Sequence, residues 1–495
     1  MKNTYKSPKV EEIIKKVGRE SEVIVKNIIL GKGENVEAWI IYVKGQAKES
    51  MIDESILKPL MLQINSELVL TEDLPEYLCK KYITSSNSKV SENIDEVVGS
   101  VKSGYTAIIV DDINTCILIN TIGGNYRSIS DPLNEYSVKG TRESFVENLD
   151  TNVSIMGRRI KDTSFTVEKM VVGRRSGTNV ALIYIKDIVN EDALNSIRQR
   201  IQAVDVDFTT SNGILEQYIE KNTYSVFPEL FTTERPDVVE ANLMEGKIAI
   251  LQDGTPNCLT APAVFIEFFQ GPEDYYQKTL VANLTRILRY IALILIITFP
   301  SIYLTLIKFN VELIPLKFIV PITQSRVNIA LPPFFEILSM EIIVELLREG
   351  GLRLPSKIAQ TISIVGGIII GDTAIQAKIV SPPTLLIVGI TVVSTFLIPN
   401  YDMSLAIRFL RFPMLILANF LGIFGISVGW FLIITHLYNM DSFGVPYFAL
   451  NKEDMKDTFI RAPLWKMKRR PKDIAYKNII RQGFFKNKFR GNDNG

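Results

Sequence analysis

Three acidic residues interrupt an otherwise apolar stretch (PPFFEILSMEIIVELL), and of all the side chains they are best suited to act on ions. Glu341 and Glu345 are four positions apart on one helical face, and Glu336 lies nine positions before Glu345 on the same predicted helix. Unpaired carboxylates at membrane depth cost several kcal/mol, so they usually face a bundle interior or a wet cavity. The pattern predicts a water-facing acidic stripe. The alternative is a helix at the surface whose acids pair with Arg348 and Arg353.

Repeated around the axis of a ring of identical subunits, such a stripe would attract cations. Glu336, Glu341 and Glu345 are therefore candidate pore or gating residues. Asp372 is a fourth candidate, either as a functional carboxylate or as half of a pair with Lys378.

Small residues precede this aspartate at a spacing of four. Ser363, Gly367 and Gly371 would form one face of a helix. A face of small side chains lets helices approach closely, so we expect these residues to serve helix packing.

The sequence offers few residues for catalysis or for binding a metal or cofactor. The single histidine, His436, lies in an apolar run, and neither a GxxxxGK[ST] nor a GxGxxG motif occurs. Cys79, Cys116 and Cys258 form no CxxC pattern, which argues against a zinc site or a disulfide framework and favours a reducing compartment. We expect neither an enzyme nor a bound cofactor.

The elements that must position these residues lie in a membrane block. Runs of about 20 apolar residues can cross a bilayer as helices. Three runs are long and uncharged: Tyr290–Ile307, Ile379–Asn400 and Phe412–Met440. A fourth, Ile358–Val380, is interrupted by charge near its end, and Pro332–Leu347 could lie in the interface, re-enter the membrane or line water. We therefore predict about four spans.

Charge sets the predicted topology. Arg286 and Arg289 precede the first span, and residues 451–495 carry 13 Lys/Arg against 5 Asp/Glu. The positive-inside rule then places both ends in the cytoplasm, which requires an even number of crossings. One conflict remains, because four crossings put Arg408 and Arg411 in an outside loop.

The basic tail mixes cations with aromatic side chains directly after the last span. This composition favours anionic lipid headgroups over nucleic acid, since the chain as a whole has a net charge of only +1. The membrane-surface candidates are Lys466, Lys468, Arg469 and Arg470.

The part before the membrane block contains an internal repeat. Residues 25–45 align without gaps on 167–187, and 95–112 align on 237–254 at the same offset of 142. Each copy has β-branched apolar runs typical of buried strands and segments with helical spacing. We predict two repeated α/β subdomains, followed by a helical transmembrane domain and a basic tail. The predicted boundaries are 1–140, 141–285, 286–440 and 441–495.

Several long strings of residues carry a family resemblance. In the soluble half they are VKGTRESFVENLDTNVSIMGRRIK (138–161), SVFPELFTTERPD (225–237), GKIAILQDGTP (246–256) and GPEDYY (271–276). In the membrane half they are PPFFEILSMEIIVELLREGGLRLP (332–355), SIVGGIIIGDTAIQAKIVSPP (363–383), IPNYDMSLAIRFLRFP (398–413), SFGVPY (442–447) and IRAPLWKMKRRP (460–471). Together they resemble the A subunits of GerA-type spore germination receptors.

The resemblance implies a multi-pass protein of the spore inner membrane with its N-terminal domain and C-terminal tail in the cytoplasm. It implies a transporter-like B subunit and a lipoprotein C subunit as partners. It also implies a homo-oligomer, expected to be a pentamer, that forms a nutrient-gated cation channel and starts germination. Asp372 stands where the family often has Gln.

Three other interpretations of the sequence remain open. A sporulation-stage V channel component of the same superfamily shares most of these motifs. A secondary transporter is disfavoured, because transporters usually show repeats within the membrane block and here the repeat is in the soluble half. A membrane-anchored scaffold would leave ion flux unchanged when Glu336, Glu341 and Glu345 are neutralised.

Overall fold

The computed structural model describes residues 8–17, 22–31, 36–65, 68–85, 87–110, 113–121, 135, 139–353, 371–448, 457–471, 474 and 478–482. Its contacts divide the chain into two compact units. One comprises residues 1–221, 230–262 and 468–495, and the other comprises 222–229 and 263–467. The predicted domain boundaries stay predictions.

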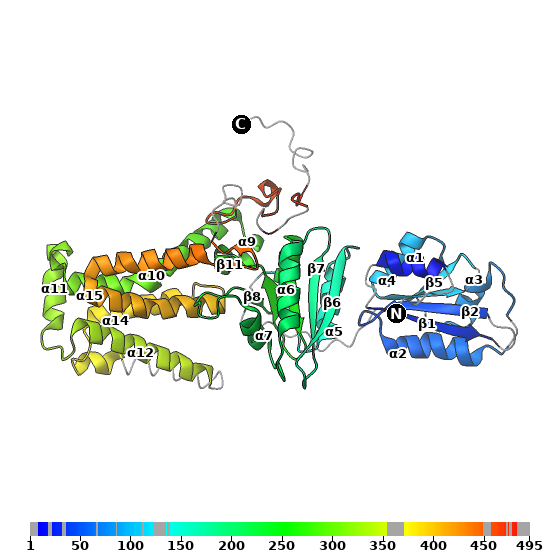
Figure 1. Ribbon diagram of the computed structural model, residues 1–495, viewed down its shortest axis with the longest axis horizontal. Helices are drawn as coiled ribbons and strands as arrows, with labels where there is room; N and C mark the ends of the chain where they lie inside the picture. The colour runs from blue at the N-terminus through cyan, green and yellow to red at the C-terminus, as the bar shows by residue number, and fades with distance from the viewer. Residues whose placement is uncertain are drawn as a thin grey trace, which may run out of the picture. The chain divides into compact units, whose positions relative to one another are not determined.

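The first unit contains two five-stranded sheets with the same topology (Figure 1). The first sheet has the order β1-β2-β4-β5-β3 and the second has the order β6-β7-β9-β10-β8, with all neighbouring strands antiparallel. The strands of the first are β1 Val23–Leu30, β2 Val36–Val43, β3 Ser88–Ser91, β4 Tyr105–Val110 and β5 Cys116–Asn120. Those of the second are β6 Phe165–Val172, β7 Thr178–Ile185, β8 Phe231–Thr233, β9 Ile248–Gln252 and β10 Cys258–Ala261.

Helices cover both faces of each sheet. In the first copy they are α1 Pro8–Val17, α2 Glu49–Ile52 with two following π-helical turns (η1 Asp53–Leu57 and η2 Pro59–Gln63), α3 Leu74–Lys81 and α4 Ile94–Lys102. In the second they are α5 Leu149–Arg159, α6 Glu191–Ala203, α7 Asn212–Ile219 and α8 Pro236–Met244. Side chains alternate across a strand, so Trp39 and Ile41 of β2 pack toward α1 and α4, while Ile40 packs toward α2 and α3.

The repeat predicted from the sequence is present in the structure. A shift of 142 positions carries β1 onto β6, β2 onto β7 and α4 onto α8, each without an offset at either end. The same shift carries Gly104 onto Gly246, and both have positive φ (96° and 98°) just before a central strand. A residue with a Cβ would be strained there, so glycine is required to turn the chain.

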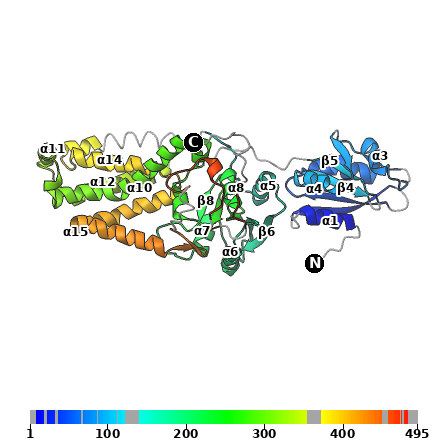
Figure 2. The same cartoon turned by 90° about the horizontal axis from the view of Figure 1, so that it is seen from above.

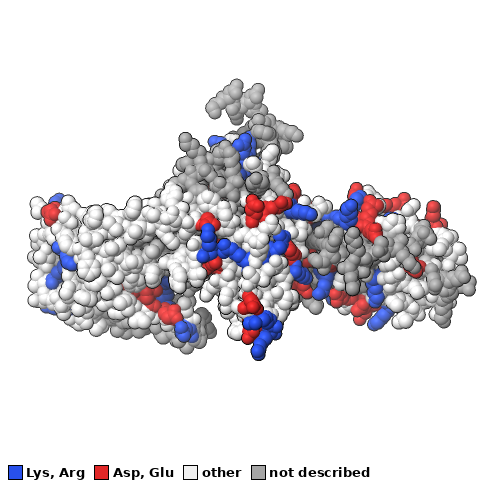
Figure 3. Space-filling model, viewed as in Figure 1, with Lys and Arg blue, Asp and Glu red and all other residues white. Residues whose placement is uncertain are grey.

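The second unit is mainly helical, and its long helices run side by side in both views (Figures 1 and 2). Its helices are η3 Phe265–Phe269, α9 Glu273–Tyr276, α10 Thr279–Lys308, η4 Val311–Leu313, α11 Leu316–Arg326, α12 Pro333–Leu352, α14 Pro382–Thr395, α15 Tyr401–Asn439 and η6 Leu464–Lys466. A short hairpin, β11 Asp441–Ser442 with β12 Val445–Pro446, follows α15. The face of this region seen in Figure 3 is largely uncharged.

Within the part of the chain that the structure describes, two helices are long and apolar enough to cross a membrane, α10 and α15. The predicted run Ile379–Asn400 contains only the 14-residue helix α14. The prediction of about four spans stays a prediction.

The predicted run 412–440 does not form one continuous helix, because α15 breaks at Gly422. This residue has φ 59° and ψ −137°. A Cβ on Gly429 would come within 2.5 Å of the Met414 sulfur, so residues beyond the break pack back against residues before it. α15 is therefore a hairpin of two antiparallel helices, 401–421 and 423–439, each within the range of about 17–25 residues that spans a bilayer.

Candidate functional site

Helix α12 carries the three predicted acids. Pro332 precedes the helix and Pro333 is its first residue, a position where the missing N–H of proline costs nothing. Glu336 and Glu341 are almost fully buried, with exposed fractions of 0% and 1%. Burial of this kind requires partners, and the structure supplies an arginine for each acid.

Glu341 and Glu345 share partners on α15. Arg411 lies between them, with Nη1 2.6 Å from Oε2 of Glu341 and Nη2 2.6 Å from Oε1 of Glu345. Arg408 reaches the other oxygen of Glu345 at 3.2 Å. Both arginines are buried, with exposed fractions of 6% for Arg408 and 3% for Arg411. The expected outside loop around Arg408 and Arg411 is therefore a helix, and its cations neutralise acids of α12.

Glu336 belongs to a separate site near the start of the helix. Its Oε2 contacts Nη1 of Arg326 at 2.7 Å, and its Oε1 accepts hydrogen bonds from the backbone N–H and the hydroxyl of Ser381 at 2.7 and 2.6 Å. These contacts join α11, α12 and the start of α14. The structure thus brings Glu341 and Glu345 together but gives Glu336 different partners.

A buried charge that loses its partner is strongly destabilising, by about 3–5 kcal/mol. The contacts of Glu341, Glu345, Arg408 and Arg411, here called the α12–α15 charge cluster, therefore hold two helices in one relative position. A pore or gating role for these acids stays a prediction.

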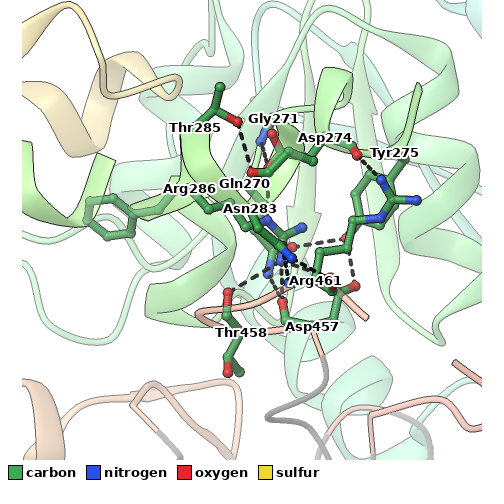
Figure 4. Close-up of polar contacts among 12 residues, drawn as sticks. Gln270, Gly271, Asp274, Tyr275, Asn283, Thr285, Arg286, Asp457, Thr458 and Arg461 are labelled. Carbon is green, nitrogen blue, oxygen red and sulfur yellow. Dashed lines mark hydrogen bonds and ion pairs between the residues drawn. The ribbon is translucent and has the colours of Figure 1, made fainter. Parts of the chain in front are cut away.

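A second buried cluster lies where α10 begins, and it is not among the sites predicted from the sequence (Figure 4). Asp274 accepts hydrogen bonds from Nε of Arg286 at 3.0 Å and from Nη1 of Arg289 at 2.7 Å. Arg286 is fully buried and also donates to the Asp457 carboxylate at 2.9 Å. Arg461 donates to the Asp274 backbone carbonyl and to that of Gln277.

This cluster ties the chain just before α10 to the chain well after α15. Tyr275, the neighbour of Asp274, also contributes, because its hydroxyl donates a hydrogen bond to the Asp457 carboxylate at 2.8 Å. The available signals were the strings GPEDYY and IRAPLW, which hold Asp274 and Arg461. Nothing in either string says that the two meet.

Comparison with known proteins identifies the family. The model of the Bacillus/Clostridium GerA spore germination protein family matches residues 11–473. The chain belongs to the GerA family.

GerA-family relatives match over nearly the full length of both chains. Spore germination protein KA of Bacillus subtilis (strain 168) is 35% identical over 478 residues, covering 96% of this chain and 87% of the relative. Spore germination protein B1 of the same organism is 33% identical and covers 96% and 98%. A crystal structure of the N-terminal domain of the A subunit of the Bacillus megaterium spore germinant receptor GerK3 is 31% identical, covering 52% of this chain and 94% of that one, with a TM-score of 0.41.

The remaining candidate residues of this GerA-family chain lie apart from the charge clusters. Asp372 is exposed and accepts a hydrogen bond from Gln376 at 2.6 Å. Gly371 is buried, and a Cβ there would contact Leu385 of α14 at 3.4 Å, consistent with close helix packing. Ser363 and Gly367 lie outside the described residues.

The basic residues of the tail have varied surroundings. Arg470 donates to backbone carbonyls, among them that of Asn478 at 3.0 Å, so much of its side chain is engaged within the protein. Lys466 lies over the Trp465 ring at 5.1 Å. Contact of Lys466, Lys468, Arg469 and Arg470 with lipid stays a prediction.

Proposed function

We propose that this chain is the A subunit of a nutrient germinant receptor, and that it forms an ion channel in the spore membrane that opens when nutrient binds. Its expected partners are a transporter-like B subunit and a lipoprotein C subunit. Its own copies would form a ring, expected to be a pentamer. Family membership and the names of the relatives support the germination role.

The observation that carries the channel proposal is the α12–α15 charge cluster. Four ionised side chains within a helical membrane unit are expensive to keep, and such residues usually mark ion pathways or moving parts. Paired as they are here, Glu341 and Glu345 are neutralised by Arg408 and Arg411. We therefore favour a gating role in which opening separates α12 from α15 and exposes the carboxylates to water and cations.

The cluster at the start of α10 supports a topology with both ends on one side of the membrane. Arg286 precedes most of the first apolar helix, and Asp457 follows the last one. Their contact at 2.9 Å requires the two segments to lie at the same end of the helices. An even number of crossings satisfies this, and the α15 hairpin contributes two of them. We propose that this shared end is cytoplasmic, in agreement with the positive-inside rule.

The test is conductance of the receptor reconstituted in liposomes with its B and C subunits. Glu345→Gln removes one carboxylate that holds Arg408 and Arg411, so we expect a higher conductance without nutrient and a smaller further increase when nutrient is added. Arg353→Gln is the matched control, because Arg353 forms an exposed pair with Glu349 at the end of the same helix. Such exposed pairs contribute little.

Unchanged basal and nutrient-triggered conductance in Glu345→Gln would refute the gating role. If Glu336, Glu341 and Glu345 are all neutralised and ion flux is still unaltered, the chain acts as a membrane-anchored scaffold and the channel proposal fails.

A further inference from the structure

A third arginine lies beside the α12–α15 charge cluster. Arg348 of α12 is one helical turn from Glu345, next to the pairs that Glu345 and Glu341 make with Arg408 and Arg411. This region therefore holds three arginines but only two carboxylates. Residues 354–370, which follow α12, contain no Asp or Glu that could supply the missing charge.

Arg348 is held in place but has no carboxylate partner among the described residues. Its Nη2 donates to the Thr395 hydroxyl at 2.7 Å, and its guanidinium lies 5.4 Å from the centre of the Phe396 ring. The Phe396 side chain is 76% exposed, so this arginine lies at the surface of the bundle. It is four residues from the last residue of α12.

The neighbouring arginines also have hydrogen-bond donors without an acceptor. The Nε atoms of Arg408 and Arg411 are buried and have no hydrogen-bond acceptor among the described residues. Buried donors without acceptors are uncommon and costly. The two carboxylate oxygens of Glu341 also lack a hydrogen-bond donor among the described residues, so an added anion would chiefly balance the excess positive charge.

We propose that Arg348 binds a phosphate group presented by an anionic phospholipid in the adjoining leaflet. A guanidinium offers paired N–H donors that match phosphate oxygens, and basic sites between membrane helices bind anionic headgroups. Leu352 follows Arg348 by four positions on the same helical face and is 64% exposed, so it and Phe396 provide apolar surface for the acyl chains. The site does not depend on channel activity, because lipid binding can be measured on the closed protein.

The experiment is native mass spectrometry of the full-length chain in detergent, with phosphatidylglycerol or phosphatidylcholine added. We expect retained phosphatidylglycerol on the unmodified chain, about tenfold weaker retention in Arg348→Gln, and near-normal retention in Arg348→Lys, which keeps the charge. Arg353→Gln removes the same charge five residues away from an exposed pair and should retain the lipid. Lipid bound to the basic tail would be the same in all four proteins.

Equal retention of phosphatidylglycerol by Arg348→Gln and Arg353→Gln would overturn the site, provided that the two variants unfold at the same temperature. Equal retention of phosphatidylcholine and phosphatidylglycerol would overturn the requirement for an anionic headgroup. Displacement of the lipid by inorganic phosphate would overturn the lipid as the source while identifying a soluble phosphate site on Arg348.

Discussion

At the scale of single residues, the role of each acid is decided by its arginine. Glu341 is 1% exposed and would be untenable as an isolated carboxylate, yet Arg411 lies 2.6 Å away. Such a pair contributes little net stability compared with two apolar residues of similar volume, but it is expensive to break from one side. A buried ion pair between two helices therefore resists any movement that would separate its two charges.

Removing one partner of this pair should therefore cost more than removing both. We expect Arg411→Gln to destabilise the membrane unit by roughly 3–5 kcal/mol, because it leaves Glu341 buried without a counter-charge. The double variant Arg411→Gln with Glu341→Gln should recover most of that loss. Thermal unfolding in detergent measures both. A double variant less stable than Arg411→Gln alone would contradict this role of the Arg411–Glu341 pair.

At the scale of elements, the break at Gly422 turns one long apolar run into a hairpin. As a straight helix, 39 residues would extend about 58 Å, nearly twice the hydrocarbon thickness of about 30 Å. The chain reverses through a backbone conformation that only glycine adopts easily. Gly425 and Gly429 then let the two halves approach closely. The GISVG string was the available sequence signal, but small residues alone do not tell where a helix reverses.

A side chain at the break should weaken the hairpin. We expect Gly422→Ala to cost about 1–3 kcal/mol, because alanine is strained at φ 59° and ψ −137°. Gly389→Ala in α14 is the control: nothing lies within 4 Å of its Cβ position, so higher helix propensity should leave stability unchanged or raise it. Thermal unfolding compares the two. Equal melting temperatures would mean that the chain does not need glycine to reverse at 422.

The cluster at the start of α10 also acts at the scale of elements, because it joins the segment before α10 to the segment after α15. Asp274 is 1% exposed and holds two arginines, so Asp274→Asn should loosen the segment that carries Arg461. We expect trypsin to cleave after Arg461 several times faster in this variant than in the unmodified chain. Asp372→Asn alters an exposed carboxylate, so we expect trypsin to cleave this variant after Arg461 at the same rate as the unmodified chain. Equal rates in both variants would show that Asp274 does not secure the segment.

At the scale of the whole molecule, one sheet topology is used twice, and equivalent positions have equivalent environments. Cys116 of β5 and Cys258 of β10 are related by the 142-residue shift, and both are fully buried. Burial raises the pKa of both thiols, which lowers their thiolate fraction and their reactivity. Cys79 lies outside this relationship and is only half-buried.

Thiol reactivity should therefore report the duplicated fold. We expect about one rapidly reacting thiol per native chain with an aromatic disulfide reagent, and all three in denaturant. Cys79→Ser should abolish the rapid phase. Rapid reaction of the remaining two thiols in the native variant would contradict the burial of equivalent strands.

The sequence by itself determined the duplicated region, the membrane block and the family, because strand and helix periodicity, apolar length and long motifs are local properties of the chain. It also identified Glu336, Glu341 and Glu345 as unusual. Only the tertiary structure decided that Arg326, Arg408 and Arg411 pair with them, that α15 reverses at Gly422, and that GPEDYY meets IRAPLW. These contacts join residues far apart in the chain, and which charges meet depends on how whole helices pack.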